Sequence, residues 1–297
     1  MKILYAVDLH GHLNRFERVF QAATDHDVEA VISGGDNFLD LFHKTPMDKA
    51  IEAQNNLFTN FLPRYLKKYE DAKIHWACTL SLHDLETFDQ QLTTLCKESE
   101  YLHICQNQIA EIGGYEFVGT GNIVDIPFPP KNRCRRDTKS CKMEPQFGAP
   151  MGVTKRGWVP IKDWEKQLMS LPTLSEDLLA LPETNELQKT VYIIHHPPKG
   201  LGFDTIILDG NKAPICGDLS HRPKKEIGSE AVYAFLKDRQ PLLALHGHFH
   251  ESPLVTGKWR GKIGNTVCIQ PGQHQNTDKT HFVIIDLPSL KMERFLE

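Results

Sequence analysis

The sequence lacks most features that would mark a membrane protein or a nucleic-acid-binding protein. No apolar run approaches 18 residues, so no segment resembles a transmembrane helix. The formal net charge of the 297-residue chain is only −4, so no overall basic field favours nucleic acid or an anionic membrane as an obligatory partner. Met1 and Lys2 run directly into an apolar segment without the layout of a signal peptide. We therefore expect a soluble, cytoplasmic protein with no membrane partner.

The chain also lacks paired cysteines and internal boundaries. It has seven cysteines, an odd number, and most are scattered without paired spacing, so we expect reduced thiols. Cys134 and Cys141 lie close together but lack the second pair that a zinc ribbon needs. No repeat, low-complexity tract or linker divides the sequence, and 40% of its residues are hydrophobic. One domain covering residues 1–297 is the expected organisation.

What the sequence does contain is a series of apolar strands that end in polar residues. The first strand, residues 3–7, is followed by Asp8 and His10. After a helical pattern, residues 30–33 form a second strand that ends in Gly35-Asp36. This strand–helix–strand spacing predicts parallel strands, whose carboxyl ends share one edge of a sheet, where open α/β sheets bind ligands. If the first strand is considered alone, Asp8 could instead cap the helix that begins near Asn14 and have no part in binding a ligand.

The rest of the chain continues this alternation and then changes. A long helix over 49–69 leads to a third strand, 73–78, and to His83 and Asp84. Gly113-Gly114 predicts a hairpin turn, and helices are expected at 161–171, 174–181 and 229–239. Buried strands at 190–194 and 242–245 end in histidines. Short apolar runs at 267–269, 282–286 and 292–295 are expected to complete a second sheet.

Residues 125–158 form a segment rich in proline, glycine and charge, and we expect a loop or lid inserted into the domain. Two interpretations stay open for its basic run: a solvated insertion, or a patch that binds nucleic acid. Over residues 131–144, only Asp137 and Glu144 oppose six cationic side chains, which are Lys131, Arg133, Arg135, Arg136, Lys139 and Lys142.

Five separate strand ends thus supply carboxylates and imidazoles. Such a mixture suits divalent metals such as Mn, Fe, Zn or Co. A carboxylate can bridge two ions about 3.5–4 Å apart, a spacing that suits in-line displacement at phosphorus. Asp40 and His43 are further candidates to line such a site, and His12 has a surface position as its alternative. The residues at the five strand ends are Asp8, His10, Asp36, His83, His195, His248 and His250.

The order of these motifs resembles the calcineurin-like metallophosphoesterase superfamily. Its pattern runs DxH, GD, GNH followed by Asp or Glu, a single His, and GHxH. Over nearly the whole chain the corresponding stretches are Asp8-Leu9-His10, Gly35-Asp36, Ser81-Leu82-His83-Asp84, His195 and Gly247-His248-Phe249-His250. The local sequence around the first and last motifs is similar to a bacterial and archaeal branch. The resemblance implies an α/β fold, a four-layer α/β/β/α sandwich of two mixed β-sheets.

The resemblance also implies roles for individual residues. Asp8, His10 and His250 would hold one metal ion, His195 and His248 a second, and Asp36 would bridge the two. The implied reaction is hydrolysis of a small phosphomonoester or phosphodiester by a hydroxide held between the ions, with manganese among the candidate metals. His83 would assist the leaving group as a proton donor or as a positive group, and Asp84 would orient it.

One position departs from the superfamily pattern. Leu82 stands where the pattern has the asparagine that ligates the second metal, and a leucine has no donor atom. We expect the second site to be weaker or more selective, with water, substrate, or an oxygen of Ser81 or Thr79 completing it. Asn37 and Asn55 are rival sources of the missing ligand. Two other functions therefore stay open: an inactive scaffold that binds proteins, and a nuclease-type phosphodiesterase.

Overall fold

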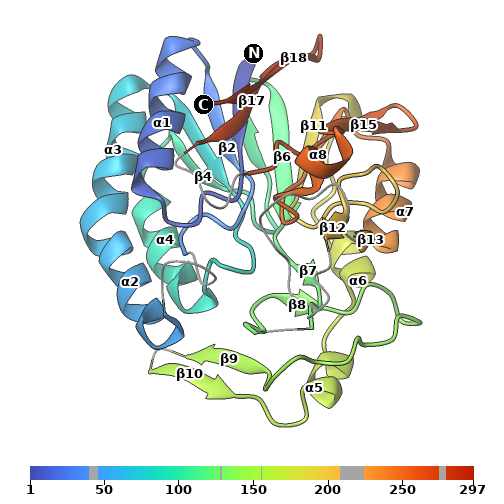
Figure 1. Cartoon of the computed structure of the whole chain (residues 1–297). Helices are drawn as coiled ribbons and strands as arrows, with labels where there is room; N and C mark the ends of the chain where they lie inside the picture. The colour runs from blue at the N-terminus through green and yellow to red at the C-terminus, as the bar shows by residue number, and fades with distance from the viewer. Residues whose placement is uncertain (40–45, 128, 155, 208–223, 274–278) are drawn as a thin grey trace.

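Two six-stranded β-sheets form the centre of the protein, and helices lie outside them (Figure 1). The computed structural model describes residues 1–39, 46–127, 129–154, 156–207, 224–273 and 279–297. The first sheet has the strand order β18 (Lys291–Leu296), β17 (His281–Asp286), β1 (Lys2–Ala6), β2 (Ala30–Ser33), β3 (His75–Cys78) and β4 (Leu102–Ile104). The second has the order β15 (Arg260–Ile263), β16 (Thr266–Ile269), β14 (Leu243–Leu245), β11 (Thr190–Ile194), β6 (Tyr115–Thr120) and β5 (Ala110–Ile112).

Strands β1 to β4 are parallel, as the alternating strand and helix patterns predict. Their outer face packs against the helices α1 (Leu13–Asp25), α3 (Leu62–Ala72) and α4 (Asp89–Cys96), and the buried cluster there includes Leu4, Val31 and Trp76. Residues of the opposite parity, such as Tyr5 and Ile32, face the second sheet. Burial on both faces explains why these strands are apolar throughout.

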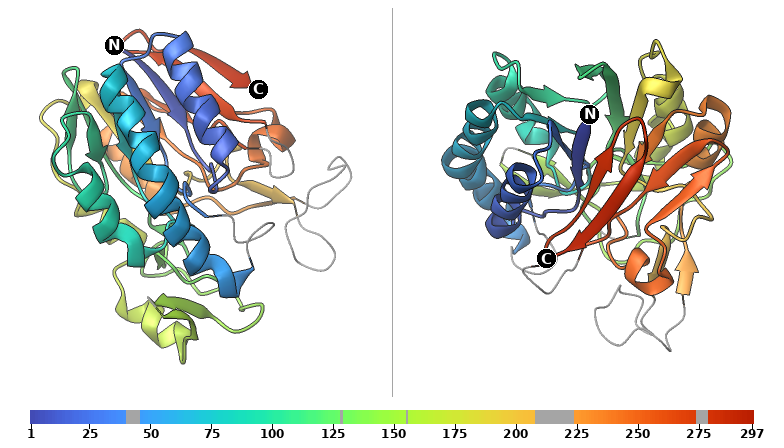
Figure 2. Two further views of the ribbon diagram at one scale, coloured as in Figure 1. Left: turned by 90° about the vertical axis from the view of Figure 1, so that its left-hand side faces the viewer. Right: turned by 90° about the horizontal axis from the view of Figure 1, so that it is seen from above.

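The helix expected over 49–69 is present but changes its winding partway. It comprises η1 (Met47–Lys49), α2 (Ala50–Asn56), a π-helical segment η2 (Leu57–Phe61) and α3. Pro63 has no backbone N–H, so the chain cannot donate the usual bond to the carbonyl of residue 59. The turned views show this long helical stretch along the outside of the first sheet (Figure 2).

One prediction about the sheets is wrong. The runs at 282–286 and 292–295 are strands, but β17 and β18 belong to the first sheet, not the second. Strand β17 pairs antiparallel with β1 from Lys2↔Asp286 to Ala6↔Phe282. Only β16, of the three short runs, completes the second sheet. Apolar alternation identifies a strand but not its neighbour, so the sequence could not choose between two open edges.

The second sheet carries its own helical layer. Helices α6 (Leu174–Leu179) and α7 (Glu230–Arg239) pack on its outer face around Tyr192 and Ile194. Val191, Leu243 and Ile269 point the other way, into the cluster between the sheets. Strand β5 pairs antiparallel with β6 across Gly113-Gly114, so the predicted hairpin is confirmed. The four layers α/β/β/α that the motifs implied are therefore observed.

Residues 125–158 are more ordered in secondary structure than the expected loop. They contain β8 (Cys134–Arg135), which pairs with β7 (Ile123–Val124), together with β9 (Met151–Thr154) and the first residues of β10 (Gly157–Pro160). Strands β9 and β10 form a hairpin at the lower edge of Figure 1. Helix α5 (Trp164–Ser170) follows. The other short elements are η3 (Glu86–Phe88), η4 (Leu187–Lys189), β12 (Thr205–Ile207), β13 (Lys224–Glu226) and α8 (Ser252–Thr256).

Most cations of the basic run are paired with carboxylates that lie outside residues 131–142. The run is therefore neither freely solvated nor an open cationic surface, because these charges are largely neutralised. The N–O distances are 2.8 Å for Lys131–Asp125, 2.6 Å for Arg133–Asp89, 2.8 Å for Arg135–Asp177 and 2.8 Å for Lys139–Glu176.

Within the described part of the chain, no helix has the length and apolar character required to cross a membrane.

Candidate metal centre

The polar strand ends meet at one edge of the two sheets and form two compact groups of possible metal ligands. Asp8, His10 and His250 make up the first group, and Asp36, His195 and His248 the second; within each group the ligand atoms lie within 4.8 Å of one another. Each group mixes one carboxylate with two imidazoles, drawn from both sheets. The six residues that the resemblance implied as metal ligands thus lie in two neighbouring groups, Asp36 being grouped with His195 and His248, and its bridging role stays a prediction.

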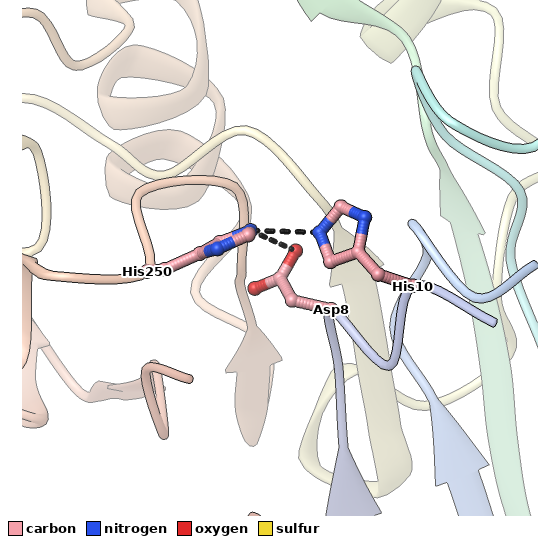
Figure 3. A group of neighbouring side chains, drawn as sticks. All are labelled: Asp8, His10 and His250. Carbon is pink, nitrogen blue, oxygen red and sulfur yellow. Dashed lines mark hydrogen bonds and ion pairs between the residues drawn. The ribbon is translucent and has the colours of Figure 1, made fainter. Parts of the chain in front are cut away.

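The first group is drawn in Figure 3, where the three side chains point toward one another. The Nε2 atoms of His10 and His250 are 2.9 Å apart, and His250 Nε2 is 3.4 Å from Asp8 Oδ1. Two nitrogens that each bind one ion at about 2.1 Å are separated by about this distance when the angle at the ion is near 90°. The spacing therefore fits a shared ion.

In the second group Asp36 and His195 are buried and His248 is partly exposed. His195 Nε2 lies 3.3 Å from Asp36 Oδ2 and 3.6 Å from Asp8 Oδ1, so it links the two groups. Neither His195 Nε2 nor His248 Nε2 makes a hydrogen bond within the described residues, and the same is true of Asp8 Oδ2. Buried polar atoms without partners are costly, and such atoms call for a ligand. Two carboxylates and four imidazoles are donors that suit divalent metals.

Backbone carbonyls fix the orientation of two of these histidines. His10 Nδ1 lies 2.9 Å from the carbonyl of Leu39, and His195 Nδ1 lies 2.8 Å from the carbonyl of Gly34. A carbonyl can only accept, so each Nδ1 must carry the proton, which leaves the lone pair of the neutral ring on Nε2. Metal-binding histidines commonly use this arrangement.

The backbone at the site is strained. Asp8, His10, Asp36 and His248 have positive φ values of 58°, 50°, 52° and 73°. Non-glycine residues rarely adopt this region, and each instance costs of the order of 1 kcal/mol or more, so four instances among six ligands mark a functional site. At Gly247, an added Cβ would lie 2.4 Å from Val7 Cγ2 and 3.0 Å from Asp8 Oδ2, which explains the glycine of the last motif.

Electrostatics favour charged carboxylates beside neutral and charged imidazoles. Burial acts to raise the pKa of Asp36, but the charges of His195 and His83 outweigh it and hold that pKa well below its usual value. The reciprocal effect raises the pKa of His195 to about 9 against the opposing effect of burial. Burial and the charges of His83 and His250 lower the pKa of His10 to about 3. A carboxylate anion and a neutral imidazole are the forms that bind metals.

His83 lies beside the first group. Its ring makes an edge contact with the ring of His10 at a centroid distance of 4.6 Å. Its backbone N–H donates to Asp36 Oδ1 at 2.8 Å, and its Nδ1 lies 3.1 Å from the carbonyl of Leu39. The turn that carries His83 is thereby tied to the second group, while its ring is held against the first.

Asp84 joins two loops at the sheet edge. Its carboxylate accepts hydrogen bonds from the backbone N–H groups of Asn37, Phe38 and Ser81 at 2.8–2.9 Å. Burial and the nearby charge of Asp36 raise its pKa to about 7, whereas these three N–H groups favour its ionised form. The described bonds place Asp84 as a support for the loop after β2 and for the turn of His83.

Leu82 does not face the second group. It is 1% exposed and packs in a cluster with Ile123, Cys134, Trp164 and neighbouring residues of the insertion. A leucine here packs against the segment that follows β7. The second group therefore consists of three possible ligands in the described structure.

The side chains that the sequence offered as replacements for the missing asparagine ligand differ in how far hydrogen bonds already occupy their polar atoms. Ser81 Oγ donates to the carbonyl of Gly121 at 2.8 Å. The amide of Asn37 is used by Ser33, Thr79 and Asp84, and Asn55 is exposed on α2. Thr79 Oγ1 is buried without a hydrogen bond in the described residues, so among these candidates it is the oxygen least committed elsewhere.

A contact from the insertion to the turn of His83 was not expected from the sequence. Asn132 Nδ2 lies 2.8 Å from the carbonyl of Leu82, 3.0 Å from that of Asp84 and 3.4 Å from that of Ser81. Arg133 Nε also donates to the carbonyl of Asp84, at 3.2 Å. Asn132 belongs to no motif and lies far from the turn in sequence, so pattern alone could not find it.

Of the three remaining candidate residues, the structure describes only His12. His12 lines a pocket beside His10, whereas Asp40 and His43 lie outside the described residues.

Comparison with known proteins gives a likeness in structure only. No protein-family model and no curated protein matches the sequence. The crystal structure of TT1561 of Thermus thermophilus matches with a TM-score of 0.56 and 15% identity, covering 99% of this chain and 98% of that one. At these identities a likeness concerns the fold alone.

Two more distant matches have TM-scores of 0.46. They are the calcineurin-like phosphoesterase YfkN from Bacillus subtilis, at 11% identity over 100% of this chain and 90% of that one, and a dimetal phosphatase from Danio rerio, at 9% identity over 100% and 98%. The sheet order, the four layers and the two ligand groups stand independently of these two matches. In its fold this chain is similar to TT1561, and two sheets between helical layers are the arrangement that the order of its motifs implies.

Proposed function

We propose that this protein is a metal-dependent phosphoesterase that hydrolyses a small phosphomonoester or phosphodiester. The observation that carries the proposal is the pair of adjacent ligand groups, linked by His195, with buried donor atoms that lack hydrogen bonds within the described residues. Divalent ions bound there would act as Lewis acids on the phosphoryl oxygens and would activate water.

The chain's own residues have distinct parts in this proposal. Asp8, His10 and His250 would hold the first ion, and Asp36, His195 and His248 would hold the second. The Nδ1–H bonds of His10 and His195 to carbonyls keep their Nε2 atoms directed for binding. If Asp36 bridges the two ions, as the resemblance implies, the first ion would have four protein ligands and the second only three, so we expect the second ion to bind more weakly than the first.

His83 is the proposed proton donor to the leaving oxygen. Its Nδ1 proton is held by the carbonyl of Leu39, so Nε2 is the nitrogen that can exchange a proton with substrate. The bond from its backbone N–H to Asp36 fixes its distance from the second group. Asp84 and Asn132 act through it as positioning residues, because they hold the turn on which it sits.

A protein-binding scaffold is the second candidate, and the position of Leu82 is the observation that favours it. Against the scaffold, His83 is held in place by Asp36 and Leu39, an arrangement that a scaffold does not require. A nuclease-type phosphodiesterase has lost its main support, because the basic run is largely ion-paired.

The test is hydrolysis of para-nitrophenyl phosphate and of its bis ester by chelator-treated protein with Mn²⁺, Fe²⁺, Zn²⁺ or Co²⁺ added back. We expect metal-dependent turnover of at least one ester and its loss in His83→Ala. Absence of turnover with every metal would favour the scaffold, whereas metal-dependent turnover that survives His83→Ala unchanged would overturn the role proposed for His83. Activity on DNA that falls steeply with salt would instead restore the nuclease alternative.

A further inference from the structure

A pocket of about 550 Å³ opens beside the first ligand group. This volume is within the range of sites that bind small organic molecules. Its wall begins at His10 and Leu39, so it shares residues with the metal centre. Leu39 links the two directly, since its carbonyl lies against the Nδ1 atoms of both His10 and His83 while the residue itself lines the pocket. A group bound here would therefore adjoin the proposed reacting centre.

The far wall comes from the helical stretch that changes its winding. The π-helical segment η2 contributes Leu57, Asn60 and Phe61 to the lining. A π-turn adds one residue to the helical turn, which shifts the faces of the residues that follow, and such turns are frequent at functional sites. Together with Phe38, the side chains of Leu57 and Phe61 form an apolar surface of a size that suits a ring system.

The polar edge of the pocket is cationic. No aspartate or glutamate of the described residues lines it, although two carboxylates lie in the adjoining metal centre. Asn56, Asn60 and Arg64 follow one another at intervals of four residues. Arg64 is exposed, donates to the carbonyl of Asn60 through Nε at 2.7 Å and also through Nη2, and forms no ion pair with a carboxylate of the described chain. Its remaining N–H groups suit an anion, because guanidinium binds phosphate or carboxylate through two parallel hydrogen bonds.

We propose that this pocket binds the organic group of the substrate, and that Arg64 binds a second anionic group on it. The inferred substrate class is a phosphoester with an apolar ring system and a further phosphate or carboxylate. This inference rests on the phosphoesterase function proposed above. Leu57 and Phe61 would contact the ring, and Asn60 would hold the guanidinium of Arg64 through its carbonyl.

The test compares adenosine 5′-monophosphate with adenosine 3′,5′-bisphosphate, which differ by one phosphate. Binding is measured by calorimetry on Mn²⁺-loaded protein that carries His83→Ala to suppress turnover, and kcat/KM is measured on the protein with His83 intact. We expect the bisphosphate to be preferred about 10-fold, since a bidentate charged contact is stronger than a neutral one. Arg64→Gln should reduce that preference to less than about 2-fold, and Arg64→Lys should restore part of it.

Arg18→Gln is the matched control, because Arg18 is an exposed arginine of α1 that does not line the pocket. This variant should keep the full preference. Melting temperatures of all variants check that the helix has not unfolded. An unchanged preference in Arg64→Gln, or no preference in the wild-type protein, overturns the inference. Binding that depends on Arg64 without hydrolysis of any ester would refute the phosphoesterase and leave the pocket assignment standing.

Discussion

The two ligand groups share one edge of the molecule but differ in how the chain completes them. The first keeps every residue that the motifs supply, Asp8, His10 and His250, each at the end of a strand. In the second, Leu82 occupies the position at which the superfamily pattern has a ligating asparagine. Its side chain instead packs against residues of the insertion. The fold can thus keep the positions of the strand ends while a neighbouring turn exchanges a ligand for a packing contact.

Replacing one histidine in each group should have the largest effect on activity and should reveal the difference in metal affinity between the two groups. His250→Ala and His248→Ala should each lower kcat/KM by at least about 100-fold, because a bound ion contributes several kcal/mol to transition-state stabilisation. His248→Ala should still bind one equivalent of metal tightly, whereas His250→Ala should lose the tighter site. Metal titration with elemental analysis separates the two. Identical metal content and affinity in both variants would contradict the difference between the groups, and His26→Ala, remote from both, serves as the control.

His83 lies beside both groups and should affect the reaction without affecting the ions. His83→Ala should lower kcat by about 10²–10⁴-fold, the usual contribution of a general acid. Metal content should be unchanged, because neither group of ligands includes His83. Steady-state kinetics with elemental analysis test this, and a loss of metal equal to that of His250→Ala would show that His83 is a ligand instead.

Leu82→Asn restores the residue type of the superfamily pattern and should not repair the second group. The new amide would be buried among apolar side chains, so we expect a loss of about 3 kcal/mol in the free energy of unfolding. Affinity for the second ion should stay unchanged. Urea denaturation and metal titration provide the measurements, with Leu82→Met as the volume-matched control. Two ions of equal affinity in a protein of undiminished stability would show that the turn can reorient.

Asn132→Ala should have an effect of intermediate size. It removes an amide that bonds to three carbonyls around His83, and leaving such groups unsatisfied costs about 1–3 kcal/mol. We expect kcat to fall about 10-fold with KM little changed, because the substrate contacts stay in place. Asn122→Ala also removes a side-chain hydrogen bond, but that bond is made to Asp177 of α6 and not to the turn, so this variant should retain full kcat. Equal losses in both variants would indicate a general structural role.

The smallest effect concerns a charge outside both groups. The ion pair with Lys139, together with the hydrogen bonds from Thr173, lowers the pKa of Glu176 to about 2. A depressed carboxylate pKa contributes stability above the unfolded value of 4.5, and that contribution is lost as the pH falls toward 2. Glu176→Gln should therefore lower the melting temperature at pH 7 by about 1 °C, as expected of an exposed pair, and the difference should vanish near pH 2. A difference that persists at pH 2 would assign the effect to the capping box.

The sequence predicted the features that depend on local pattern. Strands that end in Asp8, Asp36 and His195 are visible as apolar runs with polar ends, and parallel pairing follows from the helices between them. Sheet membership of β17 could not be predicted, because an alternating strand fits either open edge. The bonds of Asn132 depend on a long irregular connection whose path no periodicity encodes. The metals, the cytoplasmic location and the substrate stay predictions.

The ion pairs of the insertion affect how the whole protein unfolds. Arg133 pairs with Asp89 at the start of α4, on the first sheet, while Arg135 pairs with Asp177 of α6, on the second. Asp137 accepts from the backbone N–H of Glu230 at 2.8 Å, at the beginning of α7. Residues 125–158 thus fasten the two outer helical layers to each other across one end of the sandwich. The two halves, each of which contributes residues to both ligand groups, should consequently melt in a single cooperative transition rather than in two.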